Sequence, residues 1–173
     1  MRIFIAINFP EEARGEIIKI QESLPDFVGK KTEFENLHLT LKFLGDVEDS
    51  KLDEIKKRLK VINEKAFISE ITSIGTFSKE FSKIVWLHIS NCETLQEKID
   101  ESLFGLFEKE KRFMSHVTIA RIKKISDKEF FLKKIEVLKI KNLSFPVEKF
   151  SLMKSELTSS GPVYSVVEEY PLH

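Results

Sequence analysis

Two short elements, each a histidine followed two residues later by a threonine, carry the side chains best suited to chemistry. The first is His38-Leu39-Thr40-Leu41 and the second is His116-Val117-Thr118-Ile119. Only four of the 173 residues are histidine, so chance would rarely repeat this pattern. Alternate side chains of a strand share a face, so we expect each histidine to point the same way as its threonine.

A pair of imidazoles suits acid–base catalysis near neutral pH. A neutral ring can accept a proton from a nucleophile while a protonated ring donates a proton to a leaving oxygen. The short, stiff hydroxyl groups of the threonines could hold an anionic oxygen while charge builds on it. These four side chains would therefore form a phosphoryl-transfer site that needs neither a metal nor another cofactor.

Two other interpretations compete with catalysis. Histidines on strands are often structural groups that hydrogen bonds satisfy, and histidines are also common metal ligands. The duplication with threonine at matching positions favours catalysis over a structural role. No third metal ligand of a suitable type lies near either element in the sequence.

The spacing of apolar residues places both elements in strands and repeats once along the chain. Strands are predicted for residues 2–9, 37–44, 82–89, 115–122, 145–153 and 163–170, with an extended segment at 67–77 and a turn at 158–162. Helices are predicted for residues 10–24, 50–62, 95–107 and 126–138, with Ser50 and Ser126 as N-caps. The order strand–helix–strand–helix–strand thus occurs twice, which indicates an α+β protein of two related lobes. A pseudo-twofold axis between the lobes would bring both elements to one cleft.

The composition favours one globular domain that spans residues 1–173. The chain has 28 Lys+Arg and 28 Asp+Glu, so no overall charge attracts it to nucleic acid or to an anionic membrane. The single cysteine, Cys92, excludes a disulfide framework and a thiolate zinc site and fits a reducing compartment. Without a membrane-span or signal-peptide pattern, we expect a cytoplasmic monomer with no obligate protein partner.

The paired elements and their flanks resemble the two-histidine phosphoesterase superfamily. Within it, the chain is similar to the RNA 2′,3′-cyclic phosphodiesterase branch, historically called 2′-5′ RNA ligase. The resemblance runs from end to end, and the segments that carry it are residues 4–7, 35–46, 113–121, 155–157 and 161–164. Ile119 departs mildly from the family, in which leucine is frequent at this position.

The resemblance implies two antiparallel sheets, each with two helices, that face each other across an active-site cleft. It also implies hydrolysis of 2′,3′-cyclic phosphates on RNA ends or nucleotides to 2′-phosphomonoesters. By this resemblance, His38 would protonate the departing 3′-oxygen and His116 would deprotonate the attacking water. Thr40 and Thr118 would hold the nonbridging oxygens. The same groups could also join a cyclic phosphate end to a 5′-hydroxyl group, which gives a 2′-5′ linkage.

Three further residues are candidates for substrate binding. Lys42 shares a face with His38 in a regular strand and could bind phosphate, or it is an exposed lysine at a strand end. Arg121 matches a frequent phosphate contact of the family, yet its odd spacing from His116 directs it to the opposite face unless a β-bulge turns it inward. Phe43 could stack on a base, although most of the 15 phenylalanines must belong to the core.

Other functions share these residues. A non-catalytic module that binds RNA ends or nucleotides would use the same cleft, as would an enzyme that acts on another cyclic or 2′-5′ linked nucleotide. The intact histidine pair argues against the binding module, and a panel of substrates would separate the two kinds of enzyme. Lys30-Lys31, Arg112 and Lys123-Lys124 are the cationic clusters available to an RNA backbone, or they are ordinary solvated surface groups. Tyr164 follows the turn at Gly161-Pro162 and could approach the cleft, but both Tyr164 and His88 are expected to pack against neighbours.

Overall fold

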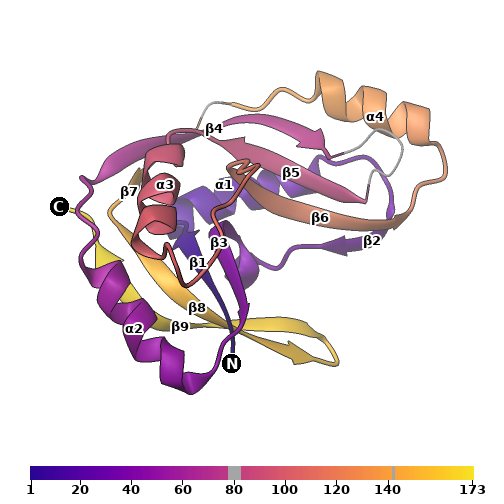
Figure 1. Cartoon of the computed structure of the whole chain (residues 1–173). Helices are drawn as coiled ribbons and strands as arrows, with labels where there is room; N and C mark the ends of the chain where they lie inside the picture. The colour runs from indigo at the N-terminus through magenta and orange to yellow at the C-terminus, as the bar shows by residue number, and fades with distance from the viewer. Residues whose placement is uncertain (78–82, 142) are drawn as a thin grey trace.

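The computed structural model describes residues 1–77, 83–141 and 143–173, which form two antiparallel sheets with helices packed against them (Figure 1). The four-stranded sheet has the order β3 (His38–Asp46), β1 (Arg2–Asn8), β8 (Lys149–Thr158) and β9 (Gly161–Pro171). The five-stranded sheet has the order β2 (Val28–Lys31), β6 (His116–Lys124), β5 (Ile84–Ile89), β4 (Phe67–Thr76) and β7 (Leu143–Val147). The helices are α1 (Glu11–Glu22), α2 (Asp49–Lys60), α3 (Glu93–Ser102) and α4 (Lys128–Val137), and a 3₁₀ turn, η1 (Phe34–Asn36), precedes β3.

Two helices cross from the sheet of the preceding strand to the other sheet. Helix α1 follows β1 but packs on β6 and β7, with Ala13 and Ile17 buried on its inner face. Helix α3 follows β5 but packs on β3, with Leu95 and Ile99 buried. Helices α2 and α4 contact β9 and β4 respectively. Each sheet is therefore covered by one helix from each half of the chain.

The hydrophobic core lies on the helix side of β3 and β6. Leu39 and Leu41 of β3 and Val117 and Ile119 of β6 are fully buried, and they belong to one continuous core cluster. The histidine and threonine that alternate with each apolar pair are only half-buried. Because alternate side chains leave opposite faces of a strand, burial of the apolar set directs the His-Thr pairs toward the space between the sheets.

The predicted α+β class, with two antiparallel sheets and four helices, is confirmed. Strand β2 was not predicted because all four of its side chains are exposed and show no alternation. The predicted strand 145–153 is two strands, β7 and β8, separated at Glu148. The third helix ends at Ser102 instead of residue 107, and the chain turns at Gly105, whose φ of 84° is readily adopted by glycine.

The N-caps differ from the expected serines. Glu48 precedes α2 in place of Ser50, and Asp127 precedes α4 in place of Ser126. The Asp127 carboxylate accepts a hydrogen bond of 2.9 Å from the backbone N–H of Phe130. The expected first residue of the strand 82–89 lies outside the described residues. Among the residues that the structure describes, no helix is both long and apolar enough to cross a membrane.

A β-bulge interrupts β3 immediately after Thr40. The register between β1 and β3 shifts by one residue at this point, so two successive side chains, Leu41 and Lys42, both point away from the cleft and are buried. Alternation resumes one residue out of phase. Phe43 therefore lies on the face of Thr40, where it is 53% exposed.

The same bulge occurs in β6 after Thr118. The register between β5 and β6 shifts by one residue there, and two successive residues, Ile119 and Ala120, are buried. The burial pattern of β6 from its first residue through Ile122 matches that of β3. Arg121 consequently takes the position that Phe43 has in the other sheet. In regular strands Lys42 would point into the cleft and Arg121 away from it. The two bulges reverse both orientations.

The contact between β2 and β6 leaves no room for a side chain at Gly29. A methyl group there would collide with the carbonyl oxygen of Arg121 and lie 3.0 Å from the Cα of Ile122. We expect Gly29→Ala to lower the free energy of unfolding by about 1–3 kcal/mol, because the new methyl group overpacks two backbones. Urea denaturation measures this change.

Gly15→Ala is the matched control. Gly15 lies in α1 and has open space where its Cβ would be. We expect a gain of about 0.5–1 kcal/mol from the greater helix propensity of alanine. Equal effects of the two substitutions would contradict the close approach of β2 to β6.

Candidate active site

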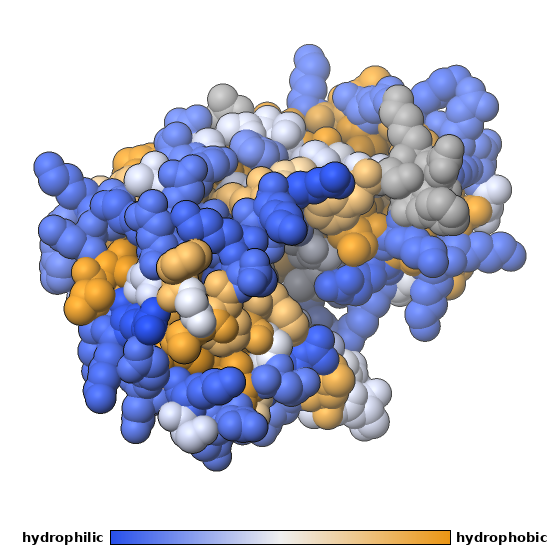
Figure 2. Space-filling model, viewed as in Figure 1, coloured by the Kyte–Doolittle hydropathy of each residue, from blue (hydrophilic) through white to orange (hydrophobic). Residues whose placement is uncertain are grey.

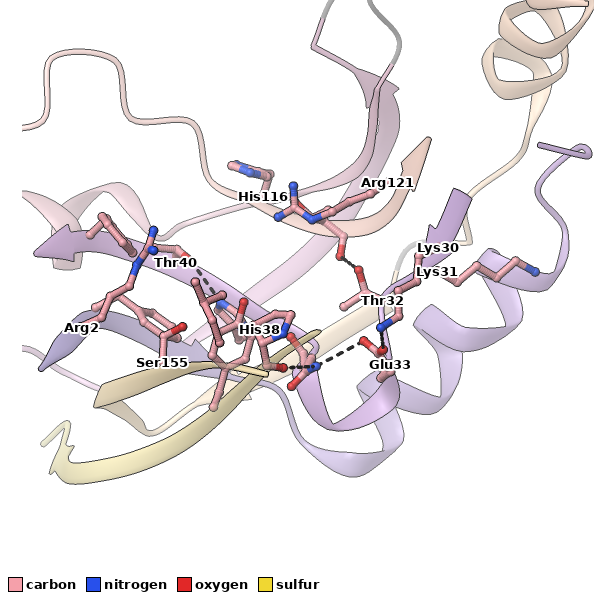
Figure 3. Close-up of a pocket in the computed structure, with 17 residues that line it drawn as sticks. Arg2, Lys30, Lys31, Thr32, Glu33, His38, Thr40, His116, Arg121 and Ser155 are labelled. Atoms are coloured by element: carbon pink, nitrogen blue, oxygen red, sulfur yellow. Dashed lines mark hydrogen bonds and ion pairs between the residues drawn. The ribbon is translucent and has the colours of Figure 1, made fainter. Parts of the chain in front are cut away.

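Both His-Thr pairs line one cleft of about 410 Å³ between the two sheets. The surface is hollowed between the sheets, and both hydrophilic and hydrophobic residues border the hollow (Figure 2). His38 and Thr40 project from β3, and His116 lies across the cleft from them at the start of β6 (Figure 3). The other residues that line the cleft are Arg2, Phe4, Lys30, Lys31, Thr32, Glu33, Asn36, Phe43, Thr118, Arg121, Ser155, Leu157, Pro162 and Tyr164.

His38 is held by a backbone carbonyl and by its own threonine. Its Nδ1 lies 2.8 Å from the carbonyl oxygen of Asn36, which can only accept, so Nδ1 carries a proton. Its Nε2 lies 3.1 Å from Oγ1 of Thr40. The ring lies between Phe4 and Tyr164, with centroid separations of 4.9 and 5.0 Å. These contacts leave Nε2 as the atom that can exchange a proton in the cleft.

His116 is held in the same way. Its Nδ1 donates to the carbonyl oxygen of Met114 at 2.7 Å, again the residue two positions earlier. The ring of Phe77 contacts the imidazole edge-on at a centroid separation of 5.0 Å. The hydrogen bond at Nδ1 fixes the tautomer, and the reactive nitrogen is again Nε2. The two imidazoles thus enter the cleft in the same chemical form.

Both histidines are neutral at pH 7 in the empty cleft. Burial is the main reason that the pKa of His38 falls to about 4, and the charges of Arg14 and Arg121 act in the same direction. Burial also lowers the pKa of His116, and His88 contributes to this shift. The hydrogen bonds to Asn36 and Met114 oppose these effects. A bound anion would favour the charged form of either ring.

The cleft has a local excess of cations. Arg2, Lys30, Lys31 and Arg121 line it, against the single carboxylate of Glu33, which is paired with Lys30. The bulge in β6 brings Arg121 into the cleft beside the histidines. The β-bulge that Arg121 needs in order to reach a bound phosphate is therefore present in the structure. Such a local cluster can attract an anion although the whole chain is neutral.

Aromatic side chains form part of the walls. Phe43 lies in the cleft, with the guanidinium of Arg2 5.0 Å above its ring. Tyr164 does pack, as expected, but its partners are His38 and Phe4, so it also forms part of the cleft wall. Phe4 and Phe77 were not predicted as site residues. The type of an aromatic residue gives no sign in the sequence of which cavity the side chain borders.

Lys42 does not reach the cleft, which corrects its expected role in phosphate binding. The bulge turns it toward α3, where it is 5% exposed. Its Nζ pairs with Asp100 and donates to the carbonyl oxygen of Glu108 at 2.7 Å. Asp100 also accepts from the side chain of Gln96 and the backbone N–H of Glu110. Burial raises the pKa of Asp100, but these hydrogen bonds outweigh it and hold the pKa below its ordinary value.

The remaining candidates lie outside the reacting centre. His88 sits opposite His116 in the sheet register, and its Nδ1 is 2.8 Å from Oγ1 of Thr72. Cys92 is buried, and burial raises the pKa of its thiol. In the described part of the chain, no group of three or more His, Cys, Asp or Glu is placed to hold a metal ion.

Comparisons with known proteins agree with this geometry. The family model described as LigT like Phosphoesterase matches residues 7–86 and 89–164. The chain is 36% identical to an RNA 2′,3′-cyclic phosphodiesterase of Methanocaldococcus jannaschii, over 98% of this chain and 100% of that protein. It is 34% identical to one of Thermotoga maritima, over 98% and 94% of the two chains. The crystal structure of TT0787 of Thermus thermophilus covers 99% of this chain and 98% of its own, with a TM-score of 0.84 and 27% identity.

Removal of the buried lysine should destabilise the fold. We expect Lys42→Met to lower the free energy of unfolding by about 3–5 kcal/mol, because the Asp100 carboxylate is left charged and buried. Urea denaturation at pH 7 measures the loss. The double variant Lys42→Met/Asp100→Leu removes both charges and should recover part of it. A loss below about 1 kcal/mol would contradict a buried ion pair.

An anion in the cleft should raise the pKa of His38. NMR titration of the imidazole resonances is expected to give a pKa of about 4 for His38 without ligand. Saturating sulfate, which stays a dianion over this range, should raise that pKa by about one to three units. Sulfate should therefore bind more tightly as the pH falls from 7 to 5. The His38→Ala spectrum assigns the resonance, and a pKa that sulfate leaves unchanged would contradict an anion site beside this ring.

Proposed function

The chain belongs to the LigT-like phosphoesterase family, and on this premise we propose that it hydrolyses the 2′,3′-cyclic phosphate ends of RNA to 2′-phosphomonoesters. The observation that carries the proposal is the pair of imidazoles that face one cleft with Nδ1 hydrogen-bonded and Nε2 available for proton transfer. The relatives named RNA 2′,3′-cyclic phosphodiesterase support the choice of substrate.

We propose that the two histidines act from opposite sides of the phosphorus atom. Nε2 of His116 takes a proton from water as its oxygen attacks phosphorus. The bond from phosphorus to the 3′-oxygen breaks, and Nε2 of His38 donates a proton to that oxygen. The phosphate stays on the 2′-oxygen. The overall reaction adds one water and leaves one imidazole protonated and one neutral, with their roles exchanged, so proton exchange with solvent restores the enzyme.

The low pKa of His38 makes its protonation depend on the substrate. An acid with a pKa of about 4 is almost wholly deprotonated at pH 7, so the empty enzyme lacks a general acid. The anionic phosphate offsets the charge of Arg121 and favours the imidazolium. A pKa depressed by burial also makes the protonated ring a stronger acid, which suits proton donation to an alkoxide leaving group. We propose that substrate binding and protonation of His38 are coupled.

The remaining groups bind the substrate in this proposal. The hydroxyls of Thr40 and Thr118 donate to the nonbridging oxygens, where negative charge increases in the transition state. The guanidinium of Arg121 pairs with the same phosphate. The exposed ring of Phe43 offers a face on which the terminal base could stack. A 5′-hydroxyl group in the place of water would give a 2′-5′ linkage by the same proton transfers.

We further propose that residues 1–173 act as a single domain, as a cytoplasmic monomer, and without a metal or another cofactor. One continuous core that both sheets share supports the single domain. The lone cysteine, Cys92, is free and buried, which is consistent with a reducing compartment such as the cytoplasm. Light scattering coupled to size exclusion tests the oligomeric state.

Replacement of either histidine should remove most of the activity. We expect His38→Ala and His116→Ala each to lower the rate of hydrolysis of a nucleoside 2′,3′-cyclic phosphate by about 10²–10⁴-fold, because each loses one proton transfer. Chromatography of the products in the presence of EDTA measures the rate and identifies the isomer. His173→Ala, at an exposed histidine that does not line the cleft, is the matched control and should retain wild-type activity.

The product separates the alternatives. A 3′-monophosphate would contradict donation to the 3′-oxygen, and loss of turnover in EDTA would contradict a metal-free mechanism. Binding of the cyclic phosphate without turnover would identify the chain as a binding module. Faster turnover of a different cyclic or 2′-5′ linked nucleotide would identify another substrate class for the same chemistry.

A further inference from the structure

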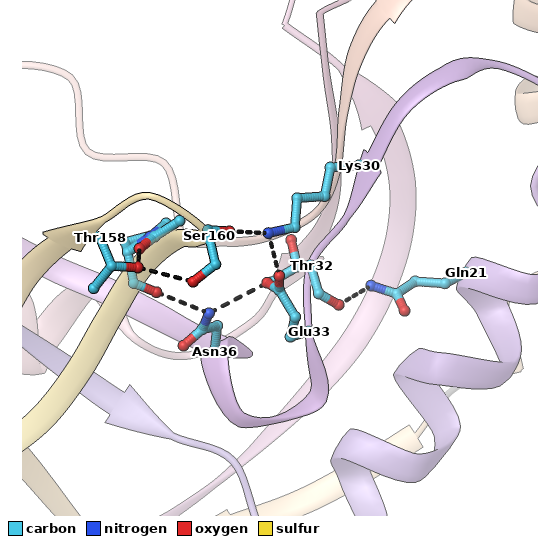
Figure 4. Close-up of polar contacts among 9 residues, drawn as sticks. Gln21, Lys30, Thr32, Glu33, Asn36, Thr158 and Ser160 are labelled. Atoms are coloured by element: carbon cyan, nitrogen blue, oxygen red, sulfur yellow. Dashed lines mark hydrogen bonds and ion pairs between the residues drawn. The ribbon is translucent and has the colours of Figure 1, made fainter.

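The β6 bulge that directs Arg121 into the cleft is held by two side chains from distant parts of the chain. Gln21 of α1 is 2% exposed. Its Nε2 donates to the carbonyl oxygen of Ile119 and to that of Thr32, each at 2.8 Å. Because both partners can only accept, the amide must present its two N–H groups to them. Figure 4 shows the hydrogen bond from Gln21 to Thr32.

Thr32 completes this set of contacts from the end of β2. Its backbone N–H donates to the carbonyl oxygen of Ile119 at 2.9 Å. Its hydroxyl donates to the carbonyl oxygen of Thr118 at 2.8 Å, an interaction that Figure 3 also shows. Two successive carbonyls at the bulge therefore receive three hydrogen bonds, none of which belongs to the ladder between β5 and β6.

A bulge needs such partners because its extra residue disrupts the regular ladder. A buried carbonyl that loses its donor costs free energy, so a chain without these donors would shift toward a different pairing. Slippage of β6 by one residue would restore the ladder and rotate each following side chain to the other face. Arg121 would then leave the cleft.

The bulge in β3 has a counterpart of this arrangement. In β3 the extra residue is Leu41, and the buried residue that follows it is Lys42. Lys42 forms an ion pair with Asp100 of α3. Each of the two crossing helices therefore supplies one buried polar side chain to the bulge of the sheet it crosses to. A buried polar side chain from a crossing helix lies at each bulge, although the two sets of contacts use different residue types. This indicates that both bulges are stabilised features of the site.

We propose that Gln21 and Thr32 are positioning residues that hold Arg121 in the cleft and thereby set its affinity for the phosphate group. The proposal rests on the proposed function, since it assigns Arg121 to the substrate phosphate. Neither residue touches the reacting atoms in this proposal. Their effect passes through the backbone of the bulge.

A double-mutant cycle on phosphate binding tests the proposal. Gln21→Met keeps the size of the side chain but removes both donors, and Arg121→Met removes the anion contact. We expect each single variant to weaken the binding of inorganic phosphate, measured by NMR titration, by about tenfold, the loss of one charge-assisted contact. The double variant should bind no more weakly than Arg121→Met alone, because Gln21 acts through Arg121.

A second pair of variants tests the hydroxyl of Thr32. Thr32→Val removes the hydroxyl at constant shape and should weaken phosphate binding, while Thr32→Ser should restore most of the affinity. If Gln21→Met does not fold, Thr32→Val and Thr32→Ser test the proposal in its place. Ile17→Val, one turn earlier on the buried face of α1, is the control and should leave the dissociation constant unchanged.

The outcomes distinguish this proposal from the proposed function. Additive effects of Gln21→Met and Arg121→Met, or unchanged phosphate affinity in both Gln21→Met and Thr32→Val, would overturn the positioning role even if wild type hydrolyses cyclic phosphate. Coupled effects in a protein without hydrolytic activity would support the positioning role and contradict the proposed function. Failure of the wild type to bind phosphate would overturn both.

Discussion

The hydrogen bond from Nδ1 of each histidine to the carbonyl two residues earlier is the interaction on which the rest of the site depends. It selects one tautomer for both rings and leaves Nε2 to the cleft. The bond forms because the backbone just before β3 and β6 turns its carbonyl toward the ring of the first strand residue. The strands, the buried alternate residues and the crossing helices keep these two turns opposite each other.

The site balances two electrostatic effects. Burial among aromatic rings makes the imidazoles poor bases in the empty cleft, while nearby cations add to that effect. The same cations favour an anionic ligand, whose charge then offsets them. A neutral protein can handle an RNA end in this way, because one phosphate group needs only a small cluster of positive charge. Few counterions would be released when a longer strand binds, so its affinity should depend weakly on salt.

The sequence was sufficient for most of the elements and for the face of each strand that carries its histidine and threonine, but not for strand β2 or for the bulges. Alternation around His38 and His116 predicted which residues share the cleft, since the pattern of a regular strand is read directly from residue types. The same rule directed Lys42 inward and Arg121 outward, and one inserted residue in each strand reverses both. The register of a strand depends on partners such as Gln21 and Asp100, which lie far away in the chain. Strand β2 was not predicted because all of its residues are exposed, so its sequence shows no alternation of apolar and polar residues.

The crossing of α1 and α3 has a consequence for the way the chain folds. Gln21 and its acceptor on Ile119 are 98 residues apart, so α1 has no completed sheet to cover until the second half of the chain is made. Contacts of such long sequence separation slow folding, because the loop between them must close first. A ribosome-bound first half would expose the apolar face of α1 and the edge of β1. Synthesis of this protein therefore includes an interval in which this apolar surface has no partner within the chain.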